Sequence, residues 1–214
     1  NATLTGHTQS TLDAAVDLLS RDALKKYNNV PGEPAQYKGQ LEGQVEIAFK
    51  IGKTATPDDV SVKTNLTASN VSVEKVVDTE KLDNANLTIV TTKTSLLVKG
   101  DGRMFNAPVS IELKKNGSAP TDASLTFVLD DAARAKRGIE TGPGFSGPVS
   151  AKVTTQLSDG DRPKADLPKG ETRATVELDL TRANIDGFLP GWLKAAGKSG
   201  KATFVATKRA DSIQ

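Results

Sequence analysis

Strict alternation of apolar and polar residues recurs along this chain and limits its fold more than any other feature. In residues 45–51, Val45, Ile47, Phe49 and Ile51 fall on one side of the alternation, whereas Glu46 and Lys50 fall on the other. A period of two places alternate side chains on opposite faces of a strand, so such segments predict strands with one apolar face. Strands of this kind form antiparallel sheets that are covered on one side only. The residues predicted to share this apolar face, as a groove or as a core, are Val45, Ile47, Phe49, Ile51, Val109, Ile111, Leu113, Val149, Val153, Val176, Leu178 and Leu180.

Further strands and the turns between them can be placed from the same pattern. The alternation changes parity near Ser69 and Asn70, which predicts a β-bulge. Residues 100–102 (Gly-Asp-Gly) are predicted to form a hairpin turn, and residues 116–117 (Asn-Gly) another turn. The other predicted strands cover residues 60–73, 85–90, 95–99, 107–114, 124–129, 148–157 and 174–180, with a last strand through Phe204.

Two helices are predicted, over residues 10–27 and 130–139. In the first, Leu12, Val16 and Leu19 recur at helical spacing. The second has an acidic start and is predicted to end at Gly138 or, a little later, at Gly142. Two helices are few for about ten strands, so the apolar face must be covered largely by a folded-over sheet or by something outside this chain.

The order of the elements predicts an approximate internal repeat with a period of about one hundred residues. In each copy a helix is followed by a Gly-led strand, a second strand and an Asn-centred kink. The strand that begins at Gly43 corresponds to the one that begins at Gly147, and the kink at Asn70 corresponds to that at Asn184.

The predicted fold class is therefore mainly β with a few helices (α+β). We expect an antiparallel curved sheet or open β-groove built from about two repeats, each led by a helix. Residues 10–129 are predicted as the first repeat and residues 130–214 as a truncated second repeat. Both belong to one continuous structural domain, excised from a longer protein. Residues 1–9 are predicted to be a tag remnant and a frayed terminus.

The composition excludes several kinds of function. The 214 residues carry a formal net charge of only +2, without clusters of Lys or Arg, so we expect no nucleic-acid partner. The absence of cysteine excludes disulfides, thiolate metal sites and cysteine nucleophiles. No apolar run approaches the roughly 18 residues of a membrane-spanning helix.

Motifs that could indicate catalysis or cofactor binding fail on their context. Residues 142–147 have the glycine spacing of a dinucleotide-binding loop, but they follow a helix and precede a strand, which is the reverse order. Residues 191–199 resemble a phosphate-binding loop with one residue too many between the glycines. His7 is the only histidine, and the aspartates of residues 159–166 lack calcium-loop spacing. We therefore predict no enzyme activity, no cofactor and no metal.

Trp192 is the only tryptophan and lies in the apolar segment 188–193. We predict that it is a structural plug that caps one end of the core, with its indole N–H hydrogen-bonded. The alternative is an exposed side chain that contacts a lipid or a protein partner.

Four segments, taken in order, resemble the AsmA-like proteins of proteobacterial envelopes, in the branch of domains of unknown function related to YhdP and TamB. The segments are residues 12–22 (LDAAVDLLSRD), 130–138 (DDAARAKRG), 178–185 (LDLTRANI) and 191–200 (GWLKAAGKSG). The resemblance implies a repeating β-groove in the periplasmic part of an inner-membrane-anchored protein, with this fragment itself soluble. It also implies a non-enzymatic role in phospholipid transport or outer-membrane homeostasis.

Two functions of different classes follow from these observations. The first is a groove segment that binds phospholipid acyl chains on its one-sided strands. The second is a structural spacer or protein-interaction module of the envelope that binds no lipid and pairs with adjacent repeats of the parent protein through an exposed strand edge. Co-purifying phospholipid would favour the first.

Overall fold

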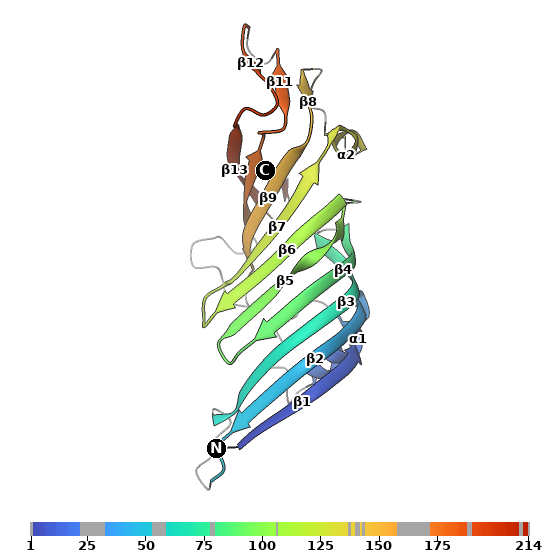
Figure 1. Cartoon of the computed structure of the whole chain (residues 1–214), viewed down its shortest axis with the longest axis vertical. Coiled ribbons are helices and arrows are strands. Elements are labelled where there is room, and N and C mark those ends of the chain that lie inside the picture. Colours follow the sequence, from blue (N-terminus) through green and yellow to red (C-terminus); the bar gives the residue numbers. More distant parts are fainter. Residues whose placement is uncertain are drawn as a thin grey trace.

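A computed structural model describes residues 2–21, 33–52, 59–77, 80–105, 107–136, 138–139, 142, 144–157, 172–187, 190–209 and 212–213 of the chain. One eleven-stranded sheet dominates it, in the order β1-β2-β3-β4-β5-β6-β7-β9-β10-β13-β14, and every pair of neighbours is antiparallel (Figure 1). A small sheet in the order β12-β11-β8 lies at one end of the molecule. The predicted mainly-β antiparallel fold is confirmed, and the division into two repeats stays a prediction.

The strands of the large sheet are long, and the helices are short. The large sheet contains β1 (Ala2–Thr11), β2 (Tyr37–Phe49), β3 (Ser61–Val77), β4 (Glu80–Thr91), β5 (Ser95–Met104), β6 (Ala107–Asn116), β7 (Thr121–Leu129), β9 (Val149–Leu157), β10 (Thr172–Asp179), β13 (Lys201–Arg209) and β14 (Ser212–Ile213). The small sheet contains β8 (Phe145–Ser146), β11 (Asn184–Asp186) and β12 (Leu193–Lys194). The helical elements are α1 (Leu12–Ser20), the 3-10 helix η2 (Pro34–Gln36) and α2 (Asp131–Lys136).

The start of the chain differs from its prediction. Residues 2–9, expected to be frayed, belong to β1, which pairs with β2 over its whole length from Ala2 to Thr11. Threonine-rich sequence favours a strand, because β-branched side chains fit a pleated surface. The predicted helix 10–27 therefore begins only at Leu12, and its part beyond residue 21 lies outside the described residues.

The prediction at residues 100–102 is also wrong, because this segment lies inside β5. A Cβ atom at Gly100 would lie 2.0 Å from the backbone oxygen of Asn86. Glycine is therefore needed there for the close approach of β4 and β5, and a turn is not formed. The turn between these strands is built instead by Thr92, whose side-chain oxygen accepts a hydrogen bond from the backbone N–H of Ser95 at 3.1 Å.

Three other local predictions are confirmed. The β3–β4 register shifts between Ala68 and Val71, and Asn70 has a positive φ of 51°, which is the predicted bulge. The turn at residues 116–117 joins β6 to β7. Helix α2 is shorter than predicted, and it ends before Gly138, which has a φ of 65°.

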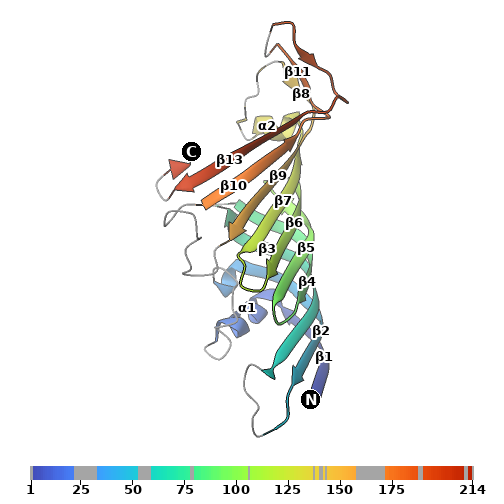
Figure 2. The same cartoon turned by 90° about the vertical axis from the view of Figure 1, so that its left-hand side faces the viewer.

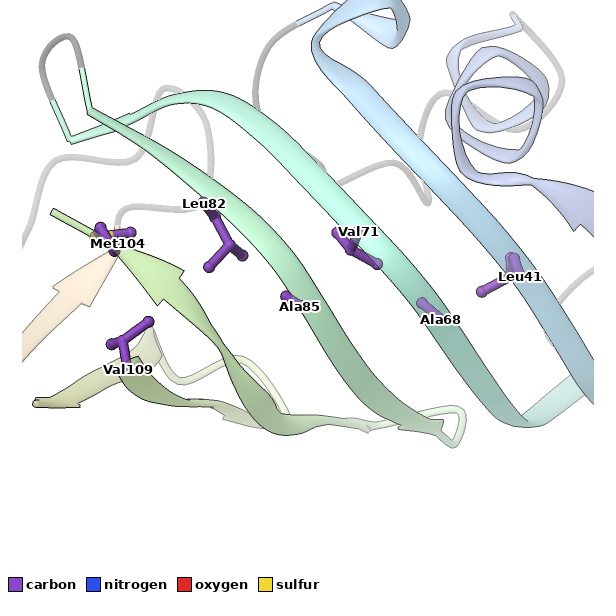
Figure 3. Close-up of a cluster of buried hydrophobic side chains, with 7 residues drawn as sticks. All are labelled: Leu41, Ala68, Val71, Leu82, Ala85, Met104 and Val109. Carbon is purple, nitrogen blue, oxygen red and sulfur yellow. The ribbon is translucent and has the colours of Figure 1, made fainter. Parts of the chain in front are cut away.

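A hydrophobic core forms along one face of β2 to β6, around the β3–β4 bulge (Figure 3). Helix α1 lies on the same side of the sheet, where Leu12 and Ala15 pack against this core (Figure 2). Phe105 and Phe127 also pack against it, with their ring centroids 6.4 Å apart. The core cluster consists of Leu41, Ala68, Val71, Leu82, Ala85, Met104 and Val109.

Candidate functional site: the apolar face of the large sheet

The register of the large sheet gathers the alternating apolar residues of distant strands on one face, which we call the apolar face. Directly paired residues of an antiparallel sheet point to the same side, so one row of partners can be followed across the sheet. This row crosses ten strands and runs through Ser10, Leu41, Ala68, Leu87, Gly100, Ile111, Leu125, Val153, Val176 and Phe204. The apolar face is therefore continuous from β1 to β13.

Most residues predicted from the alternation lie on this face. Val109 and Val149 are buried in it, and Phe49 is 38% exposed. The half-buried ones are Val45, Ile47, Ile111, Leu113, Val153, Val176 and Leu178. The register connects all of these positions through their partners.

Two predicted residues do not belong to the sheet. Ile51 lies beyond the end of β2 and is 72% exposed. Leu180 follows the end of β10, and its backbone N–H donates a hydrogen bond to the oxygen of Gly200 at 2.8 Å. In both cases the alternation extends past the last residue that has a strand neighbour, so periodicity alone could not locate the end.

Burial divides the apolar face into two parts. The core cluster is buried, as the packing of α1 and Phe105 against it requires. At the other end of β1 to β3, Leu4 is 62%, Val62 is 41% and Phe49 is 38% exposed. Leu4 and Val62 are both paired with Ile47, so these side chains form one patch, the exposed corner. Within the described residues, the exposed corner has no cover comparable to α1.

The opposite face of the sheet is polar. Lys63 pairs with Glu46 across β3 and β2, with Nζ and Oε1 3.0 Å apart. Lys99 and Glu112 form a similar pair across β5 and β6 at 3.4 Å. These pairs are exposed and contribute little to stability, but they keep this face in water. The charged side chains of these two ion pairs therefore lie on the face opposite to the apolar face.

Arg134 of α2 is a buried cation that the sequence did not single out. Its guanidinium donates hydrogen bonds to the backbone oxygens of Leu129 at 2.9 Å and Gly147 at 2.8 Å. It also pairs with the carboxylate of Asp131 and lies 4.9 Å from the ring centroid of Phe145. The short helix thus fastens β7 to the connection that precedes β9. The one signal in the sequence was an Asp and an Arg three residues apart at the start of a helix.

Lys194 of β12 closes the same end of the molecule. Its ammonium group donates hydrogen bonds to the backbone oxygens of Leu180 at 2.6 Å and Ala183 at 2.8 Å, and the side chain is buried. Trp192, the predicted plug, is 45% exposed and does not cap the core. The hydrogen bonds of Lys194 to two backbone oxygens provide the partners that a buried ammonium group requires.

Gly144 and Gly147 serve backbone packing, whereas a Cβ at Gly142 would meet no atom within 4 Å. A Cβ at Gly144 would lie 1.8 Å from the backbone oxygen of Asp186, and Gly147 has a positive φ of 88°. The N–H of Gly147 donates to both carboxylate oxygens of Asp131 at 3.1 Å. These contacts account for the glycine spacing through the approach of β8 to β11, without a phosphate.

Hydrogen bonds lower the pKa of two carboxyl groups. The pKa of Asp83 is lowered mainly by the ammonium of Lys81, 2.9 Å away, and also by the hydroxyl of Ser72. The pKa of Asp179 is lowered by hydrogen bonds from the side chain and backbone of Thr181. Both carboxylates are thereby held in their charged form and fix local structure.

The described residues contain no group of three or more His, Cys, Asp or Glu side chains that could hold a metal ion. The aspartates of residues 159–166, which lack calcium-loop spacing, lie outside the described residues. His7 is part of β1 and is exposed. Across the described ranges, no helix is both long enough and apolar enough to span a membrane.

Comparisons of this chain with protein-family models, with curated proteins and with solved structures find no match. The resemblance to AsmA-like proteins stays a hypothesis that rests on the four sequence segments.

Proposed function

We propose that this chain is a non-enzymatic module of the bacterial cell envelope whose apolar face binds the acyl chains of phospholipids. The observation that supports the proposal most is the continuous apolar face across ten strands, of which the exposed corner has no cover among the described residues. The location in the periplasm, and the anchoring of the parent protein in the inner membrane, rest on the resemblance to AsmA-like proteins alone.

An extended acyl chain suits such a surface. Each methylene group that leaves water contributes about 0.8 kcal/mol, so about six buried methylenes contribute on the order of 5 kcal/mol. Leu4, Val62 and Phe49 offer side chains that already lie at the surface, so binding there requires no unfolding of the core. The polar face carries ion pairs such as Lys63–Glu46, so substitutions on the two faces can be compared.

The test compares two valines of equal exposure on opposite faces. Val62 and Val128 are each 41% exposed; Val62 lies on the apolar face, whereas Val128, next to Phe127 in β7, lies on the polar face. Binding of a phospholipid with a fluorescent acyl chain would be titrated for Val62→Asp, Val128→Asp and the unchanged chain. We expect Val62→Asp to weaken binding about tenfold and Val128→Asp to leave it unchanged.

Equal binding by both variants, or no binding by the unchanged chain, would refute the proposal. Native mass spectrometry of the chain purified from bacterial cells gives an independent measurement. Co-purified phospholipid is expected from the unchanged chain and from Val128→Asp, and less from Val62→Asp.

A structural spacer or protein-interaction module is the second candidate function. The observation in its favour is that, in the part of the chain that the structure describes, β1 has no outer neighbour and β13 has one only at Lys208 and Arg209. This candidate predicts that the purified chain carries no lipid and that its contacts are made through those edges.

A further inference from the structure

The large sheet has two open edges. Among the described residues, β1 has a neighbour on one side only, namely β2. β13 pairs on its outer side with β14, but only through Lys208 and Arg209. Within the described residues, the outer edge of 201–207 is therefore unpaired. Each edge presents a row of backbone N–H and C=O groups that can pair with another strand.

Neither edge carries the features that usually prevent pairing. Residues 2–11 of β1 and residues 202–207 of β13 contain no Lys, Arg, Asp, Glu or Pro. The registers of β1 with β2 and of β13 with β10 are continuous, so no bulge turns either edge away. Apolar side chains are exposed along both: Leu4 is 62%, Phe204 is 50% and Val205 is 55% exposed. Charge, proline and bulges are the common protections of natural edges.

The strand count makes the two edges complementary. From β1 to β13 there are ten strands, and each is antiparallel to the next, so β1 and β13 run in opposite directions. A second copy placed beyond β13 in the same orientation therefore adds its β1 in the antiparallel direction. Leu4 and Phe204 both lie on the apolar face, so the apolar faces of the two copies lie on the same side.

Pairing of one edge with its own copy is less favourable. An antiparallel pair of two β13 strands centred on Val205 brings Lys201 of one copy opposite Arg209 of the other. Like charges directly opposite each other in a sheet are destabilising. A pair of two β1 strands avoids this repulsion, but it leaves both apolar β13 edges in water.

We propose that copies of this chain associate head to tail, with β1 of one copy added to the 201–207 edge of β13 of the next. A contact between two different surfaces does not close on itself after two copies, so it builds rings or open filaments. The proposal rests on the edges alone and stands whether or not the apolar face binds lipid.

The experiment uses one lysine substitution at each edge. Leu4→Lys places a charge on the β1 edge, and Phe204→Lys places one on the β13 edge. Leu18→Lys is the matched control, because Leu18 is 51% exposed on α1, away from both edges. Sedimentation velocity over a range of protein concentrations measures the mass of the species formed, and circular dichroism verifies that each variant is folded.

The unchanged chain and Leu18→Lys are expected to form species whose mass rises with concentration beyond that of a dimer. Leu4→Lys and Phe204→Lys are each expected to be monomeric alone. Mixed in equal amounts, they are expected to form a species of twice the monomer mass and nothing larger, because only one intact edge of each remains.

Three results would overturn the proposal. The first is a monomeric unchanged chain at all concentrations, and the second is an equal mixture that stays monomeric. The third is a dimer of Phe204→Lys alone, which would show β1-to-β1 pairing, or of Leu4→Lys alone, which would show β13-to-β13 pairing. If Phe204→Lys does not fold, Val205→Lys replaces it as the variant of the β13 edge. Val205 lies on the polar face, where it is paired with Thr175, and it is more exposed than Phe204.

Discussion

The core cluster and the exposed corner are built by the same alternation on the same face of the same sheet, yet only one of them is buried. In the core cluster, Val71 is fully buried and Met104 is 2% exposed, whereas Leu4 in the exposed corner is 62% exposed. The sequences of the strands do not distinguish the two. The comparison shows that a period of two decides which side of a strand is apolar. Whether that side is buried is decided by the elements that pack against it, such as α1 on the core cluster.

The largest effect is expected in the core cluster, from Met104→Ala. Deletion of a buried methionine side chain removes its transfer free energy and leaves a cavity, so the free energy of unfolding should fall by about 2–5 kcal/mol. Urea unfolding followed by circular dichroism measures this change. A loss below about 1 kcal/mol would mean that this part of the face is as loosely packed as the exposed corner.

The next largest effect is expected from Gly100→Ala, which tests the close approach of β4 and β5 over the core. The added Cβ would lie 2.0 Å from the backbone oxygen of Asn86, so the strands must move apart. We expect a loss of about 1–3 kcal/mol in the same measurement. Gly6→Ala in β1 is the matched control, since a Cβ at Gly6 meets no atom within 4 Å, and it should lose nothing. Equal stabilities of the two variants would contradict the account.

Small effects on stability are expected in the exposed corner. Leu4→Ala should lower the free energy of unfolding by no more than about 0.5 kcal/mol and Phe49→Ala by about 1 kcal/mol, because both side chains remain partly in contact with water. The same variants should weaken binding of a phospholipid acyl chain. If either variant instead loses as much stability as Met104→Ala, the corner is part of the folded core, and the contrast between the two regions fails.

The smallest effect is expected from a change of pH. It concerns Asp83, which follows Leu82 of the core cluster in β4. The lowered pKa of Asp83 means that its contribution to stability is present above its ordinary pKa of 3.8 and is lost as the pH falls through its value in the folded protein. The side chain is partly exposed, so this contribution is about 0.5 kcal/mol at most. The free energy of unfolding, measured at neutral pH and at about pH 3, should therefore fall slightly less on acidification for Asp83→Asn than for the unchanged chain.

High salt serves as the control for that prediction, because it screens the attraction of Lys81 and should reduce the difference between Asp83→Asn and the unchanged chain. A difference that is the same at low and high salt would assign the effect to the hydrogen bond from Ser72.

Much of the local structure could be predicted from the sequence. A change of parity indicates the bulge at Asn70, and an Asn-Gly pair indicates the turn at 116–117. Alternation indicates which residues of β9 share a face. The start of the chain was mistaken, because ten residues with few large apolar side chains resemble a frayed terminus until their strand partner is known. The glycines of 100–102 were mistaken for a turn because the same residue type serves turns and close strand contacts.

The two buried cations could not be found from the sequence. Arg134 and Lys194 are buried because backbone oxygens from distant segments converge on them, and no spacing records that convergence. The apolar neighbours of Trp192 in the sequence favour a buried plug, but the side chain is 45% exposed, because an apolar stretch of sequence does not reveal what packs against it.

The sequence by itself determined that this chain forms antiparallel strands with one apolar face, because side-chain direction along a strand depends only on the parity of the residue number. The tertiary structure alone decided which apolar residues are buried, which glycines bring strands together and which two strands remain at the edges. Those properties depend on segments such as α1 that are remote in sequence, and alternation within a strand contains no information about what will lie against it.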